Sequence, residues 1–269
     1  RLACALRRVG FEYVFDTDFS ADLTIMEEGS ELLERLGAAA KGEGDSRGWP
    51  MFTSCCPGWV RFVKARYPEF VDSLSTSKSP QQMFGAIAKT YYAKVLGVEP
   101  ERLFVVSVMP CTAKKAERQR DRVKDLVDCV LTFEELQALF DSRDIDMSTL
   151  EEDVLENASY FGRIFARSGG LSDAVVEALK EQNNEDFKLN AIACDGIEAC
   201  KAALLRASKN VLPNNFIEGM ACTGGCIGGA GCLTHGEKNK ADVDKYGKQA
   251  MEKTILDAIS VTDVGPEAE

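Results

Sequence analysis

Hydrophobic and polar positions alternate along the chain between short apolar runs and longer segments with helical spacing. Apolar runs of about four to eight residues are typical of buried strands, and apolar residues about every three to four positions are typical of amphipathic helices. The strand-like runs are residues 13–15, 50–53, 103–108, 189–193 and 216–221. The segments with helical spacing are residues 1–11, 20–36, 59–67, 81–96, 171–181, 196–207 and 246–259.

Capping and turn residues give several of these segments defined ends. Thr132 and Glu135 have the spacing of a capping box, which predicts a helix through Phe140. Gly97 directly follows the helical spacing of residues 81–96 and predicts that this helix ends there. The run at 103–108 is the clearest candidate for a buried strand. We expect residues 41–48 to form a polar loop and residues 261–269 to form a tail.

Strands that alternate with helices predict an α/β fold of mainly parallel sheets flanked by helices. A chain of 269 residues can bury a sizeable core, as one large domain or as two lobes. In parallel sheets, ligands bind beyond the carboxyl ends of the strands. Three groups of cysteines follow strand-like runs in this chain, so we expect them to meet at one shared site.

Composition narrows the possible partners. The net charge of −11 argues against binding to nucleic acid or to anionic membranes, since both reward clustered lysine and arginine. The chain has no apolar run long enough to cross a bilayer, and residues 1–11 lack a signal-peptide pattern. The cytoplasm is therefore the expected location.

The grouping of the cysteines points to a thiolate metal site. The chain has ten cysteines and one histidine, so a large metal site must be mainly thiolate, which suits zinc, Cu(I) or iron–sulfur clusters. Neighbouring thiols rarely bind one cubane together, so one of the pair Cys55–Cys56 joins Cys111, Cys222 and Cys226 as four candidate ligands of a 4Fe–4S cluster. Structural zinc is the rival, although the chain lacks the C-x-x-C knuckles typical of it.

Four other cysteines fit the ordinary role of small hydrophobic residues. They are Cys4, Cys129, Cys194 and Cys200.

The three cysteine groups lie in long motifs: TSCCPGW at 53–59, MPCTAKKAE at 109–117 and FIEGMACTGGC at 216–226. In order and spacing these closely resemble the three signature motifs of the iron-only (di-iron) hydrogenases. The stretches DLTIMEE at 22–28 and KSPQ at 78–81 resemble that family too. The resemblance covers nearly the whole chain.

The resemblance implies a 4Fe–4S cubane bridged to a di-iron subsite that carries CO, cyanide and a bridging dithiolate (the H-cluster). By motif position, Cys56, Cys111, Cys222 and Cys226 would hold the cubane, and Cys226 would also bridge to the di-iron subsite. The implied reaction is the reversible conversion of two protons and two electrons to H2. The implied domain is residues 1–269, a single catalytic domain of two lobes with the cofactor between them, truncated at its N-terminus and without an accessory ferredoxin-like domain.

The resemblance also implies a path for protons. Cys55, beside the cubane ligand, resembles the proton-donating thiol of the family. Glu28, Glu31 and Arg35 fall on one face of a helix and, with Ser75, match a chain that carries protons inward from solvent. Taken by itself, that stripe of charges would be a solvated helix face with a local ion pair.

Further residues match the walls of the family's cofactor pocket. Lys114 resembles the lysine that donates to a cyanide ligand, and Glu117 would anchor it. Met109 and Met220 would pack their thioethers against the di-iron site; otherwise they fill core space. Ser79, Pro80 and Gln81 resemble another stretch that lines the family's cofactor pocket. We interpret His235 as an ordinary loop residue.

The third motif departs from the family pattern. It continues as GGAGC at 228–232, where many members have Gly-Gly-Gly-Gln-Pro, so Cys232 is an extra thiol to which we assign no ligand role. The expected partners are a ferredoxin-like electron carrier and the maturation proteins that load the di-iron subsite. The competing interpretations are a non-catalytic relative, either a hydrogen or redox sensor or an iron–sulfur assembly factor, and a zinc-stabilised interaction protein.

Overall fold

The strands form two small parallel sheets. The computed structural model describes residues 1–40, 48–153, 155, 158–184, 187–236 and 238–260. One sheet has the order β1-β5-β4, and the other pairs β2 with β3, with every pairing parallel. The strands are β1 (Met51–Phe52), β2 (Val106–Met109), β3 (Cys129–Thr132), β4 (Ala191–Asp195) and β5 (Phe216–Met220). The predicted α/β fold of parallel sheets flanked by helices is confirmed.

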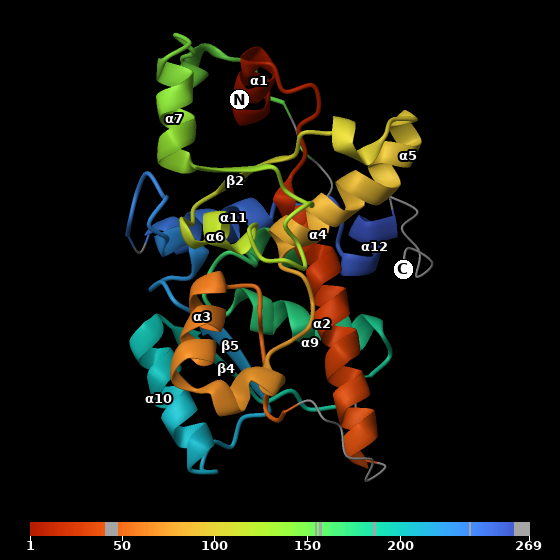
Figure 1. Ribbon diagram of the computed structural model, residues 1–269, viewed down its shortest axis with the longest axis vertical. Helices are drawn as coiled ribbons and strands as arrows, with labels where there is room; N and C mark the ends of the chain where they lie inside the picture. The colour runs from red at the N-terminus through yellow and green to blue at the C-terminus, as the bar shows by residue number, and fades with distance from the viewer. Residues whose placement is uncertain (41–47, 154, 156–157, 185–186, 237, 261–269) are drawn as a thin grey trace.

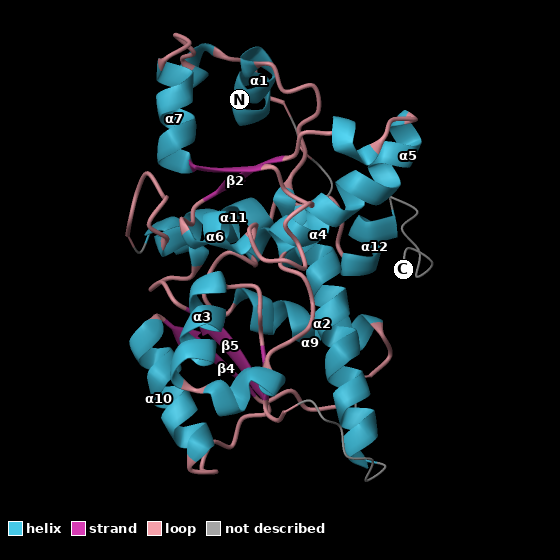
Figure 2. Ribbon diagram, in the orientation of Figure 1, coloured by secondary structure: helices cyan, strands magenta, loops and turns pink. Residues whose placement is uncertain are grey.

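Helices are the main secondary structure of the described residues and cover both sheets (Figure 2). The longer ones are α2 (Thr17–Ala40), α3 (Pro57–Arg66), α7 (Phe133–Asp141), α9 (Gly170–Glu181), α10 (Ile197–Ser208) and α11 (Lys238–Gly247). The shorter ones are α1 (Leu2–Val9), α4 (Pro80–Ile87), α5 (Ala93–Leu96), α6 (Ala113–Glu117), α8 (Tyr160–Ile164) and α12 (Ile255–Ser260). In Figure 1, β4 and β5 lie in the lower half with α3 and α10, β2 lies in the upper half beside α7, and α4, α6 and α11 lie between the two sheets.

The central strand of the three-stranded sheet, β5, is buried on both faces. Side chains alternate along a strand, so Phe216 packs with α2 and α9 on one face while Ile217 packs with α3 and α10 on the other. Gly219 keeps the second face open for the ring of Trp59, because a Cβ at this position would lie 2.3 Å from that ring. Burial on both faces explains why β5 is apolar apart from Glu218 and Gly219.

Several predicted boundaries are confirmed. Thr132 and Glu135 form the capping box at the start of α7, with both reciprocal hydrogen bonds present. The predicted helix over 81–96 is α4 and α5 joined by a π-helical turn (Ala88–Tyr92), and it ends at Gly97 in the left-handed conformation.

Other expectations are wrong. Residues 13–15 form no strand; the Tyr13 and Phe15 rings instead make edge-to-face contacts with Tyr92, with ring centroids 5.5 and 5.0 Å from its own. The expected strand over 103–108 is limited to β2 and is only half-buried, since β2 has a single partner strand and Phe104 is 73% exposed.

The predicted helix over 246–259 is two helices, α11 and α12, because the Glu181 carboxylate accepts hydrogen bonds from the Ile255 and Leu256 amides and starts a new helix there. The strand β3 was not predicted. The expected tail at 261–269 and most of the expected loop at 41–48 lie outside the described residues.

Candidate metal centre

Three cysteine-bearing loops begin where strands end. β1 ends shortly before Cys55 and Cys56, and β2 ends shortly before Cys111. β5 ends shortly before Cys222 and Cys226. Because β1 and β5 are parallel neighbours, their carboxyl ends deliver two of these loops to the same edge of the sheet.

The four predicted ligands share one site. Burial raises the pKa of the Cys226 thiol, and the nearby thiols of Cys56, Cys111 and Cys222 raise it further, since a second thiolate would be repelled by theirs. Burial also raises the pKa of Cys222, and here Cys56 and Cys111 add to the effect in the same way. The loops therefore converge as the sequence predicted.

The donor set fits a cubane better than a single ion. Among the residues that the structure describes, no group of three or more histidine, cysteine, aspartate or glutamate side chains lies close enough to hold one metal ion. Zinc needs its donors at about 2.0 to 2.3 Å from one point. A cubane is bound by thiolates that stand apart around a larger body. Thiols from three loops that lie near one another, without meeting at a point, are compatible with the second case.

Glycines shape the loop that carries Cys222 and Cys226. Gly225 has a φ of +82°, and a Cβ there would lie 2.6 Å from the Ser168 amide nitrogen. A Cβ at Gly228 would lie 1.9 Å from the Thr223 carbonyl oxygen. The Cys226 amide donates to the Ala166 carbonyl at 2.7 Å, which fixes the loop against the segment between α8 and α9.

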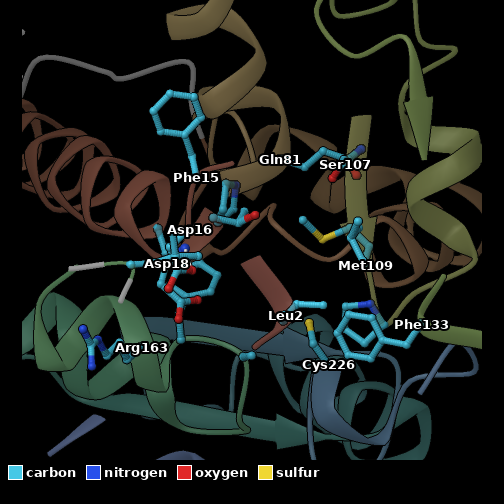
Figure 3. A pocket seen from close by; sticks show the side chains of 18 of the residues that line it. Leu2, Phe15, Asp16, Asp18, Gln81, Ser107, Met109, Phe133, Arg163 and Cys226 are labelled. Atoms are coloured by element: carbon cyan, nitrogen blue, oxygen red, sulfur yellow. Dashed lines mark hydrogen bonds between the residues drawn. The ribbon is translucent and has the colours of Figure 1, made fainter. Parts of the chain in front are cut away.

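A cavity of about 1220 Å³ lies beside the thiols. Its lining includes Cys55, Cys111, Cys226 and Met109. Figure 3 shows Cys226 and Met109 turning their sulfur atoms toward the same space from different segments of the chain. Cys56 and Cys222 lie outside this lining. Of the four candidate ligands, the cavity therefore adjoins Cys111 and Cys226.

Lys114 lies buried at the cavity wall. Its Nζ donates to the Cys55 carbonyl at 2.9 Å and to Glu117 Oε2 at 3.0 Å. Burial alone would lower the pKa of Lys114, but Glu117 outweighs this and leaves that pKa raised, so the ammonium stays charged. Glu117 also accepts hydrogen bonds from Ser79 Oγ and from Gln81 Nε2. Ser79 and Gln81, which were predicted to line the pocket, thus hydrogen-bond to the carboxylate of the Lys114–Glu117 ion pair.

The stripe of charged residues on α2 is buried, so the solvated helix face expected from the pattern alone is wrong. Glu31 Oε1 accepts from Arg35 Nη2 at 2.6 Å, and Glu31 Oε2 accepts from Ser75 Oγ at 2.8 Å. Arg35 is 2% exposed and also donates to the carbonyls of Gly48 and Leu74. The structure therefore brings Glu31, Ser75 and Arg35 into one hydrogen-bonded chain.

Glu28 lies between this chain and Cys55. Burial raises the pKa of Glu28 to about 8, although a hydrogen bond from the Ser54 amide and the nearby Ser75 hydroxyl oppose the shift. Its Oε2 is buried without a partner in the described part of the chain. Burial raises the pKa of Cys55 as well, and the Glu28 charge adds to that effect. At neutral pH, therefore, both groups carry protons.

The remaining predicted residues divide between cavity and core. Pro80 lines the cavity together with Gln81. Met220 is 1% exposed and packs in the core cluster that also contains Cys55, outside the cavity lining. Cys194 and Cys200 are buried as expected for small hydrophobic residues, whereas Cys4 and Cys129 are half-buried. His235 is exposed and contacts the Gly229 carbonyl.

Sequence reasoning missed one carboxylate that positions the centre. Glu218 is fully buried on β5 and accepts hydrogen bonds from the Gly169 amide and from the Ser172 amide and hydroxyl. It thereby fixes the start of α9 to the strand that leads into Cys222. The sequence contained an indication of this role, because Glu218 is a charged residue inside an otherwise apolar strand-like run, and such residues are rarely buried without a partner.

The chain matches the family described as "Iron only hydrogenase large subunit, C-terminal domain" over residues 1–230. The chain belongs to this family. The most similar solved structures include a variant of the FeFe-hydrogenase HydA1 from Chlamydomonas reinhardtii, with a TM-score of 0.79 and 27% identity over 98% of this chain and 82% of that one.

The relatives of this chain include both proteins named as hydrogenases and a protein named as an iron–sulfur cluster assembly factor. The NADP-reducing hydrogenase subunit HndD of Solidesulfovibrio fructosivorans is 43% identical over 87% of this chain and 46% of its own length. Iron hydrogenase 1 of Clostridium pasteurianum is 35% identical over 95% of this chain and 49% of its own length. The cytosolic Fe-S cluster assembly factor narfl of Danio rerio is 30% identical over 94% of this chain and 69% of its own length. The chain thus spans about half the length of these two hydrogenase relatives.

Proposed function

We propose that this chain forms the catalytic domain of an iron-only hydrogenase that interconverts protons, electrons and H2. The observation that carries the proposal is the buried chain of Glu31, Ser75 and Arg35, which continues through Glu28 to Cys55 at the cavity. Burying two charged side chains together with a third ionisable one, Glu28, is costly. A protein that only held a cluster would have no use for such a chain, whereas proton transfer requires one.

The residues for the cofactor are present. Cys56, Cys111, Cys222 and Cys226 would bind a 4Fe–4S cubane, with the Cys226 sulfur shared with a di-iron subsite in the adjoining cavity. When bound, that cofactor would supply the electrons and the site at which hydrogen forms. Lys114 is held by Glu117 at the cavity wall, where its ammonium can donate to an anionic ligand such as cyanide. Met109 and Pro80 supply apolar wall.

The side chains between solvent and cavity move the proton. Cys55 holds a proton on a neutral thiol, because burial raises its pKa. Glu28 can replace a proton that Cys55 gives up, since its own raised pKa of about 8 keeps it protonated at neutral pH. The Ser75 hydroxyl donates to Glu31 and lies near Glu28, and Arg35 fixes the Glu31 carboxylate by two hydrogen bonds. Arg35 reaches the loop carbonyls at 48 and 74 and so orients the outer end of the chain.

A second candidate is a non-catalytic iron–sulfur protein, as sensor or assembly factor. The match to the narfl assembly factor supports it, as does the changed third motif ending at Cys232. We favour catalysis because Cys55, Glu28 and Lys114 occur together with their hydrogen-bond partners.

The proposed partners and location follow from the activity. We propose a ferredoxin-like protein as the electron carrier and maturation proteins as the source of the di-iron subsite, with the cytoplasm as the location. No helix in the described part of the chain is long and apolar enough to cross a membrane.

Anaerobic reconstitution tests the proposal. The cubane is first assembled with iron and sulfide, a synthetic di-iron complex is added, and H2 is measured with a reduced viologen. The parent protein should evolve H2, and Cys55→Ala should lose at least about 100-fold in rate while its iron content stays unchanged. Cys129→Ala, a half-buried thiol on β3, is the matched control and should keep full activity. A fully loaded parent without H2 turnover would instead support the non-catalytic candidate.

A further inference from the structure

Cys232 closes the glycine-rich loop and faces the same space as two of the proposed ligands. It is 6% exposed, and it lines the cavity together with Cys111 and Cys226. Apart from Cys55, the proposed proton donor, the described chain therefore offers five thiols around the centre, one more than a cubane uses. Two further buried cysteines, Cys194 and Cys200, lie in the core beneath the three-stranded sheet, outside the cavity lining.

Backbone contacts hold Cys232 next to Cys111. The Gly231 amide donates to the Pro110 carbonyl at 3.1 Å, so the residues directly before the two cysteines are hydrogen-bonded to each other. A Cβ at Gly229 would lie 2.1 Å from the same carbonyl oxygen, which shows how closely the loop follows this segment. The Phe133 amide donates to the Gly231 carbonyl at 3.0 Å and fixes the loop to the start of α7.

The thiol of Cys232 is held only by weak bonds. Its Sγ donates to the Cys226 carbonyl at 3.5 Å and to the Ile227 carbonyl at 3.4 Å. Such S–H bonds to neutral carbonyls are weak, and both acceptors belong to the same turn as the donor. Rotation of the Cys232 side chain toward the cavity therefore costs little free energy, because only these weak hydrogen bonds are lost.

We propose that Cys232 is a reserve iron ligand that can replace Cys111 on the cubane. The inference rests on the proposed function, because it requires the cubane to be bound here. In the exchange, the Cys232 sulfur forms the new bond to iron, the bond from Cys111 to that iron breaks, and the proton of Cys232 passes to the released Cys111 thiolate. The cubane keeps four thiolate ligands, and neither iron nor sulfur changes oxidation state.

The test compares single and double variants after anaerobic assembly of the cubane alone, without the di-iron subsite. Cys111→Ala should keep iron per chain close to that of the parent and give a four-thiolate EPR spectrum after reduction. Cys111→Ala/Cys232→Ala should lose most of this iron. Cys111→Ala/Cys129→Ala is the matched control, and it should behave like Cys111→Ala because Cys129 lies outside the cavity lining.

A conservative variant guards against misfolding as an explanation. Cys111→Ala/Cys232→Ser keeps a small polar side chain at both carbonyls, and its serine oxygen on iron should change the EPR spectrum relative to Cys111→Ala. Circular dichroism confirms that each variant is folded. The inference is overturned if folded Cys111→Ala loses its iron as completely as the double variant, or if replacing Cys232 by serine leaves the spectrum of Cys111→Ala unchanged. Failure of the parent itself to bind a cubane would refute the proposed function instead.

Discussion

Two buried ion pairs lie at the candidate centre, Glu31 with Arg35 and Lys114 with Glu117. Each charge is taken out of water and is stabilised only by its partner and by the surrounding hydrogen bonds. Such pairs add little net stability, but the loss of one partner leaves the other as an uncompensated buried charge. The pairs therefore mark positions where a single substitution has a large effect.

Lys114→Met should destabilise the folded chain by about 3 to 5 kcal/mol, because Glu117 is then left buried without its cation. Adding Glu117→Gln should recover much of that loss, since a neutral amide can still accept from Ser79. The free energies of unfolding from urea titrations of the two single variants and the double variant give the coupling energy. If the two single losses of unfolding free energy simply add in the double variant, the charges of Lys114 and Glu117 do not stabilise each other.

Glu28→Gln should slow H2 evolution by at least about 100-fold, because glutamine fills the same space but cannot give up and regain a proton. Iron content and the EPR spectrum of the cubane should match those of the parent. Glu27→Gln, the neighbouring residue on α2, is the control for a change of charge near the site. Parent-like turnover in Glu28→Gln would exclude Glu28 from the proton path.

At the scale of elements, α2 carries much of the site and is fixed in place by Asp22. This carboxylate is fully buried and accepts hydrogen bonds from the Ser159 amide at 2.8 Å and from the Ser159 hydroxyl at 2.5 Å. Ser159 is the N-cap of α8, so one carboxylate ties α2 to the start of that helix. Desolvation by burial outweighs these bonds and raises the pKa of Asp22 to about 7.

The raised pKa of Asp22 predicts a pH-dependent stability. In the unfolded chain this carboxyl ionises near its ordinary value of 3.8, whereas in the folded chain it stays protonated to about 7. Its contribution is therefore fully present below pH 3.8 and is lost as pH rises through 7, by up to about 1.4 kcal/mol per pH unit. Urea unfolding across this range should show a shallower decline for Asp22→Asn than for the parent. Equal slopes would contradict the assignment.

The third cysteine loop depends on glycine at Gly228. In Gly228→Ala, the new Cβ would lie 1.9 Å from the Thr223 carbonyl oxygen, so the turn that carries Cys222 and Cys226 must shift. We expect most of the cubane iron to be lost after reconstitution. Gly236→Ala is the matched control, because nothing lies within 4 Å of a Cβ built there. Normal iron content in Gly228→Ala would show that the loop tolerates the shift.

The sequence predicted elements well where the pattern reflects local physics. The capping box at Thr132 and the left-handed Gly97 depend on neighbouring residues alone, and both occur where expected. The break between α11 and α12 depends on Glu181, a residue far away in sequence, so no local pattern could reveal it. β3 was missed because it is short and half-buried against a single partner strand.

At the scale of the whole molecule, the cysteine motifs predicted the convergence that the structure shows. Motif order and the carboxyl ends of strands were sufficient to bring Cys56, Cys111 and Cys226 to one place. They were not sufficient to show that the charged face of α2 is buried, because burial depends on how α2 packs against α4 and α9. The buried hydrogen-bonded chain of Glu31, Ser75 and Arg35 is therefore a property of the assembled fold rather than of any segment.

The proposed cubane would join the two sheets, since Cys111 follows β2 whereas Cys56 and Cys226 follow β1 and β5. A ligand that binds only the folded state stabilises it, and one that joins separate elements should protect both. Cubane assembly should therefore raise the unfolding temperature and slow amide exchange in β2 and α6 together with β5. The exposed end of α10, near Leu205, should be unaffected and serves as the internal control. Removal of iron with a chelator should reverse both effects together; protection limited to one sheet would mean that the cluster is held by one set of loops alone.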